Sequence, residues 1–162
     1  MPKKYINDKY CVRCGRKEAT PYLKKHCKLF EGKQAVDIGC GNGRNTVFLR
    51  EHGFDVVPID MVDDFGEKIV LGKDRIPLPD KSVDVIVANY IFMFLNKKER
   101  ENVIDEIKRI ARFHCQIMVE LYAAKDSEAP DKESSLALQK ELFDRLGWNK
   151  VRYSQERFIA QK

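Results

Sequence analysis

Long apolar runs are the first feature that this 162-residue chain lacks. Its longest apolar stretch, Val83 to Leu95, is interrupted by Asp84 and Asn89 and is shorter than the roughly 20 residues that a membrane-spanning helix needs. The first residues, MPKK, lead into polar sequence rather than into the apolar segment of a secretory signal. We therefore expect no membrane segment and a cytoplasmic location.

Histidine and cysteine are too few or too scattered for several kinds of site. The three histidines form no triad pattern, and five cysteines form no even-numbered disulfide framework, which fits reduced thiols. Cys11 and Cys14 have the spacing of a zinc knuckle, but a structural zinc site needs four ligands. The nearby candidates, His26 and Cys27, are adjacent on a predicted helix and point in different directions. We expect free thiols and no metal.

Positive charge is abundant, but it is unevenly spread. The net charge is +5, and residues 1–35 hold ten lysine and arginine residues against three acidic ones. Aromatic residues are sparse in this segment, which favours a solvated basic arm over a nucleic-acid-binding surface. The length fits one domain of about 150 residues, so we divide the chain into a basic arm, residues 1–19, and a folded domain, residues 20–162.

The segment Gln34 to Leu49, QAVDIGCGNGRNTVFL, is the most informative part of the chain. It predicts an apolar strand, a loop with glycine at every second position, and a helix. Gly39, Gly41 and Gly43 permit a sharp turn and a close approach of the backbone to a ligand. The dinucleotide-binding fingerprint needs its third glycine one residue later, where this chain has Arg44.

Strand and helix patterns alternate along the rest of the chain. A strand ending at Asp60 follows the first helix, and residues 83–89 predict a buried strand. Asn96 and Glu99 resemble a capping box that opens a helix. Further elements are predicted as a helix 20–32, a strand 116–121, a helix from Ser134 or Ser135 to Gly147, and a strand pair at 150–154 and 157–161. This alternation predicts a mostly parallel sheet with helices on both faces.

Together, DIGCGNG at residues 37–43, Asp60 after the second strand, and DRIPLPDKSVDVIVAN at residues 74–89 resemble the motifs of class I S-adenosylmethionine (SAM) dependent methyltransferases. GCGNGRNTVFL and FMFL (residues 92–95) are most similar to the tellurite-resistance and thiopurine type enzymes. The resemblance implies an α/β, doubly wound, Rossmann-like fold with a C-terminal antiparallel hairpin, and SAM as the cofactor.

The resemblance also implies the residues that would hold SAM. Asp60 would accept hydrogen bonds from the ribose hydroxyls, Met61 would pack on adenine, and Asp74 would accept from the adenine amino group. Loop and strand-end capping is the alternative role for Asp74 and Asn89. The full implied set is Asp37, Gly39, Cys40, Gly41, Asn42, Gly43, Asp60, Met61, Asp74, Arg75, Ile76 and Asn89.

No catalytic base is required for transfer from an activated sulfonium, because the protein mainly orients the reactants and excludes water. If an acceptor must lose a proton, the candidates near strand ends are Tyr90, Glu120 and Tyr122. The two tyrosines also suit aromatic walls. Glu120 lies in an apolar strand, so burial would perturb its pKa.

One departure from the family concerns residues 61–82. Only seven residues separate Asp60 from a third strand at Lys68 to Gly72, whereas a parallel crossover needs about a dozen. Residues 73–82 are likewise too short and proline-rich for a helix. We expect a reduced edge of the sheet near the third strand.

The sequence leaves three hypotheses for function. The favoured one is a SAM-dependent methyltransferase with a small-molecule acceptor. The second is the same chemistry on nucleic acid or protein, held by the basic arm. The third is a non-catalytic module that binds SAM or acts through partners.

Overall fold

The computed structural model describes residues 17–61, 65–122, 135–154 and 156–162. In these residues one seven-stranded sheet has the order β3-β2-β1-β4-β5-β7-β6. The strands are β1 (Gln34–Ile38), β2 (Asp55–Asp60), β3 (Glu67–Lys68), β4 (Val83–Asn89), β5 (Ala111–Glu120), β6 (Asn149–Tyr153) and β7 (Arg157–Gln161). Strands β1 to β5 pair in parallel, and β7 is antiparallel to β5 and β6. The predicted sheet and its C-terminal hairpin are confirmed.

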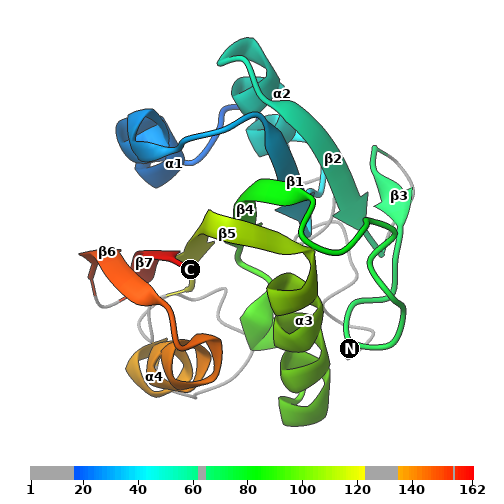
Figure 1. Ribbon diagram of the computed structural model, residues 1–162, viewed down its shortest axis with the longest axis vertical. Coiled ribbons are helices and arrows are strands. Elements are labelled where there is room, and N and C mark those ends of the chain that lie inside the picture. Colours follow the sequence, from blue (N-terminus) through cyan, green and yellow to red (C-terminus); the bar gives the residue numbers. More distant parts are fainter. Residues whose placement is uncertain (1–16, 62–64, 123–134, 155) are drawn as a thin grey trace.

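Helices cover both faces of this sheet, with α1 and α2 above it and α3 and α4 below it in the view of Figure 1. They are α1 (Pro21–His26), which continues as a 3₁₀ turn to Leu29, α2 (Arg44–Glu51), α3 (Lys97–Ile110) and α4 (Ser135–Leu146). Leu23 and Leu49 pack with the β4 residue Val85 on one face, whereas Ile104 and Leu142 belong to the core of the other face. Burial on both faces explains why the central strands are almost continuously apolar.

Capping residues set the starts of two helices, and the cap of the second is predicted from the sequence. The Thr20 side chain accepts from the backbone N–H of Leu23, and Pro21 is the first residue of α1. Asn96 and Glu99 form a complete capping box at α3. These two helices therefore begin where a side chain satisfies backbone groups that the helix leaves unpaired.

The sheet is reduced at its β3 edge, as expected, and the third strand is even shorter than the predicted one. β3 has only two residues, and the predicted extension to Gly72 is wrong because Val70 begins a turn whose carbonyl accepts from Lys73 and Asp74 N–H. Arg109 of α3 then fastens the following loop by donating to the carbonyls of Ile76 and Leu78, at 2.8 Å each. Side chains of α3, Arg109 among them, thus hold a segment that has no helix of its own.

β5 also begins earlier than the predicted residue 116, because Ala111 already pairs with Val83 before an irregularity in the register. No helix within the described ranges is long and apolar enough to cross a membrane.

Candidate functional site

The glycine loop connects the carboxyl end of β1 to α2. Gly39 and Gly43 both have positive φ, at 74° and 79°. A Cβ on Gly39 would lie 2.0 Å from the Ile91 side chain, and one on Gly43 would lie 2.3 Å from the Phe65 ring. These two glycines are therefore required by close packing as well as by conformation. The loop is anchored to the neighbouring strand because Gly39 and Cys40 N–H donate to the Ile59 carbonyl.

Asp60 ends β2 directly beside this loop. Its Oδ2 accepts from the backbone N–H of Gly41 at 2.9 Å. An acidic side chain and a glycine loop thus meet at the carboxyl ends of two adjacent parallel strands, where doubly wound sheets bind their ligands. Met61 follows Asp60 and is half-buried. The side chain of Asn42 accepts from Arg44 N–H at 3.3 Å and so supports the start of α2.

Asp37 lies beneath the loop and is almost completely buried, with 2% of its surface exposed. The Thr46 hydroxyl of α2 donates to its carboxylate at 2.6 Å. Burial raises the pKa of Asp37 to about 6, although the Thr46 hydrogen bond opposes this change, and the charge of Asp60 adds to it. Burial likewise raises the pKa of the Cys40 thiol, so this side chain stays protonated.

Buried polar side chains gather at the same edge of the sheet. Among the described residues nine polar or charged residues are buried, and six of these lie at or beside the carboxyl ends of β1, β4 and β5. They are Thr20, Asp37, Asn45, Thr46, Asn89 and Glu120. Asn45 of α2 accepts from Thr20 N–H at 3.1 Å, and Asn89 Nδ2 donates to Glu120 Oε2 at 2.6 Å. The polar edge is therefore continuous from the glycine loop to β5.

Glu120 is surrounded by hydrogen-bond donors. Besides Asn89, Arg157 Nε lies 3.2 Å from its Oε1, the Tyr90 hydroxyl lies 3.4 Å away, and the Thr20 hydroxyl also bonds to it. Burial raises the pKa of Glu120, as the sequence predicts, and these donors oppose the change. Burial also raises the pKa of the Tyr90 hydroxyl. The raised pKa of Tyr90 disfavours its ionised form near neutral pH, and the donors around Glu120 occupy the carboxylate oxygens that a base would use to take a proton.

Aromatic rings surround this polar group. Tyr90, which has φ of 59°, packs against Tyr122 with ring centroids 4.9 Å apart, and Phe94 meets Tyr122 edge to face. The Arg157 guanidinium lies over the Tyr22 ring. The arrangement fits the aromatic-wall alternative for Tyr90 and Tyr122 better than a role as base.

Asn89 has one polar atom without a partner among the described residues. Only 7% of this residue is exposed, and its Oδ1 accepts no hydrogen bond. An unpaired buried carbonyl oxygen costs about 1–3 kcal/mol. Such an atom at the carboxyl end of β4 is suited to accept a hydrogen bond from a bound molecule.

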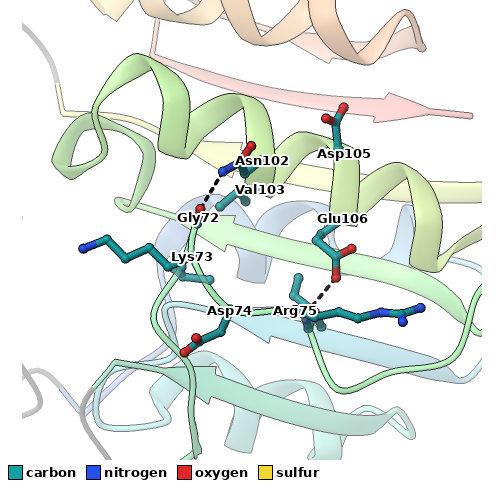
Figure 2. Close-up of a pocket in the computed structure, with 10 residues that line it drawn as sticks. Gly72, Lys73, Asp74, Arg75, Asn102, Val103, Asp105 and Glu106 are labelled. Atoms are coloured by element: carbon teal, nitrogen blue, oxygen red, sulfur yellow. Dashed lines mark hydrogen bonds between the residues drawn. The ribbon is translucent and has the colours of Figure 1, made fainter.

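Asp74, Arg75 and Ile76 line a cavity of about 330 Å³ between their loop and α3 (Figure 2). Its lining includes none of the glycine-loop residues. The Asp74 carboxylate accepts from Val70 N–H at 2.8 Å, and Ile76 N–H donates to Glu106. In this conformation Asp74 caps its own turn, so its adenine contact stays a prediction.

Sequence reasoning missed Thr20, Thr46 and Phe65. Thr46 lies nine residues after Asp37, and a hydroxyl one turn into a helix that follows a buried acid is the signal that could have found it. No comparable local signal marks Phe65, whose ring covers Gly43 through tertiary packing. Within the described ranges no group of histidine, cysteine and acidic side chains suits a metal ion; Cys11 and Cys14 lie outside the described residues.

The methyltransferase domain family matches residues 36–118. Phosphoethanolamine N-methyltransferase 1 of Triticum aestivum is 26% identical over 107 residues, which cover 56% of this chain and 22% of the relative. TehB of Haemophilus influenzae, described as a probable SAM-dependent methyltransferase, is 27% identical over 94 residues, which cover 50% and 33%. The chain thus matches between about a fifth and a third of the length of these curated relatives.

Solved structures agree on the fold. TehB of Haemophilus influenzae has a TM-score of 0.74 at 17% identity, covering 96% of this chain and 66% of TehB. A SAM-dependent methyltransferase of Aquifex aeolicus has a TM-score of 0.65 at 19% identity, covering 88% and 92%. With the family match over just more than half of its length, the chain belongs to the methyltransferase domain family and has the class I SAM-dependent methyltransferase fold.

Proposed function

We propose that this protein transfers a methyl group from SAM to a small-molecule acceptor. The observation that carries the proposal is the contact between Asp60 Oδ2 and Gly41 N–H, which joins the β2 acid to the glycine loop. A charged acceptor beside exposed backbone suits a ribose, whose two hydroxyls donate to a carboxylate. Asn89 ends β4, which pairs with β1 on the side away from β2, and its unpaired Oδ1 also suits a donor-bearing ligand.

In the proposed mechanism the protein binds and orients rather than activates. SAM, when bound, supplies a methyl group on a positively charged sulfur. Asp60 fixes the ribose and the glycine loop fixes the methionine part, while Tyr90 and Tyr122 form a wall that keeps water from the reacting atoms. Positioning of this kind supplies much of the rate of a displacement that needs no bond to the enzyme.

A small acceptor is supported by the curated relatives, two of which are phosphoethanolamine N-methyltransferases. The alternative is a macromolecular acceptor held by the basic residues 1–19, most of which lie outside the described ranges. Phosphate contacts make nucleic-acid binding fall steeply with salt. A submicromolar, salt-sensitive complex with RNA or DNA at physiological ionic strength would overturn the small-molecule assignment.

Calorimetric titration with SAM and S-adenosylhomocysteine tests cofactor binding. We expect Asp60→Ala to weaken SAM binding by at least about tenfold, because a charge-assisted contact is lost. Asp55→Ala is the matched control, since Asp55 begins the same strand at its opposite, exposed end. Absence of binding heat for either ligand with folded wild-type protein would overturn the proposal.

A further inference from the structure

The hydrogen bond between Asn89 and Glu120 dictates how the Asn89 amide is turned. An ionised carboxylate can only accept, so Asn89 must present its Nδ2 to Glu120, at 2.6 Å. Its Oδ1 consequently points away from Glu120, is buried, and has no partner in the described part of the chain. Nδ2 also lies 3.5 Å from the Thr20 hydroxyl, but this hydroxyl can donate as well as accept, so the shorter contact with Glu120 decides which way the amide is turned.

Glu120 is itself held in place. Only 1% of it is exposed, and Arg157 lies 3.2 Å from its other oxygen. Arginine carries donors only, so Oε1 must remain an acceptor on the Arg157 side. Arg157, Glu120 and Asn89 thus form a series of hydrogen bonds. Arg157 fixes Glu120 as an acceptor, and Glu120 fixes the Asn89 Nδ2 as the donor.

This series of hydrogen-bonded side chains ends beside the glycine loop. Asp37 of β1 is paired with Val87 of β4, so Asn89, two residues further, lies at the level of Gly39. Asp60 stands on the far side of β1, at the end of β2. If the ribose of SAM lies at Asp60 and the rest of the molecule crosses the glycine loop toward β4, its methionine part reaches Asn89.

We propose that Glu120 is a positioning residue that turns Asn89 so that Oδ1 accepts a hydrogen bond from the ammonium group of the SAM methionine moiety. This inference rests on the proposed function. The ammonium is a charged donor, and a bond from a charged donor to a carbonyl oxygen is stronger than a neutral one. Glu120 acts through Asn89 and takes no proton from the acceptor.

The substitution Glu120→Gln exchanges the donor and acceptor roles at Asn89. The glutamine oxygen must stay beside Arg157, which leaves its NH₂ group facing Asn89. Asn89 then flips to offer Oδ1 to the glutamine and presents Nδ2, a donor, to the ammonium. Two donors face each other, so the binding of any ligand that carries the ammonium should suffer.

The test compares SAM with 5′-methylthioadenosine, which keeps the adenosine and the sulfur but lacks the ammonium. We expect Glu120→Gln to raise the dissociation constant of SAM by at least about tenfold and that of 5′-methylthioadenosine by less than about twofold. Glu141→Gln is the matched control, because Glu141 also pairs with an arginine, Arg100, but joins α4 to α3. It should change neither constant.

A second variant keeps the test decisive if Glu120→Gln does not fold. Asn89→Ser removes Oδ1 and should weaken SAM while sparing 5′-methylthioadenosine, and adding Glu120→Gln to it should cause no further selective loss. Equal losses for both ligands, or no loss for either, would overturn the inference while the proposed function stands. Failure of wild-type protein to bind either ligand would instead overturn the proposed function.

Discussion

Asp37 illustrates how one buried acid couples protonation to folding. Its pKa in the folded protein is raised from 3.8 to about 6, chiefly by burial. Between these two values the folded state binds more protons than the unfolded state, so stability falls as the pH rises through this window. Above pH 6 the folded protein carries a buried carboxylate whose main support is the hydroxyl of Thr46.

Asp37→Asn removes this titration. We expect the free energy of unfolding of the variant, relative to wild type, to increase by about 2 kcal/mol between pH 4.5 and pH 7.5, because only the wild type then loses stability at this site. Urea unfolding of both proteins at the two pH values measures this difference, and other titrating groups cancel in it. A difference that does not change with pH would contradict the raised pKa.

Among the elements, α3 carries the loop that replaces a crossover helix. The Arg109 guanidinium donates to the Ile76 and Leu78 carbonyls and pairs with Asp80 and Glu106. Lysine cannot reproduce this fork of donors. Arg109→Lys should therefore lower the free energy of unfolding by about 2 kcal/mol, for two lost backbone contacts, and speed hydrogen exchange in residues 70–82.

Arg75→Lys is the control for Arg109, because Arg75 makes an exposed ion pair with Asp80. It should change stability by less than about 0.5 kcal/mol. Equal effects of the two substitutions would show that the loop does not depend on Arg109.

The capping box at the start of α3 makes a second prediction for this element. Asn96→Ala removes the side-chain acceptor for Glu99 N–H, 3.0 Å away. We expect a loss of about 1 kcal/mol in urea unfolding. Lys98→Ala, at an exposed position in the same turn, should be nearly neutral. If both substitutions leave stability unchanged, the box does not hold the helix end.

Signals that lie within a few residues predict these elements well. The glycines at 39, 41 and 43 identify the loop, and Asn96 with Glu99 identifies the start of α3, because turns and caps are local chemistry. Two of the donors around Glu120, Asn89 and Arg157, come instead from residues 31 and 37 positions away, and Arg109 reaches the Ile76 and Leu78 carbonyls across 33 and 31 positions. No sequence spacing encodes such contacts. The hydrogen bonds around Glu120 and those between Arg109 and the loop after β3 are therefore seen only in the folded structure.

For the whole molecule, the proposed cofactor should act as a stabiliser. Ligand at about 100 times its dissociation constant adds about 2.7 kcal/mol to the folded state. For a domain of this size that corresponds to a rise in melting temperature of about 5–10 °C. Differential scanning calorimetry with and without SAM measures the shift, and Asp60→Ala should show a smaller one at the same SAM concentration. An unchanged melting temperature under saturating SAM would contradict binding to the native fold.

The two outer strands of the sheet have a bearing on how the protein behaves at high concentration. Free backbone N–H and C=O groups on a long, flat edge allow sheets from different molecules to join and grow into aggregates. β3 offers two residues, both charged, and β6 has a register irregularity between Lys150 and Arg152. The short β3 thus also protects the protein, since neither edge presents a regular apolar template on which a second sheet could extend.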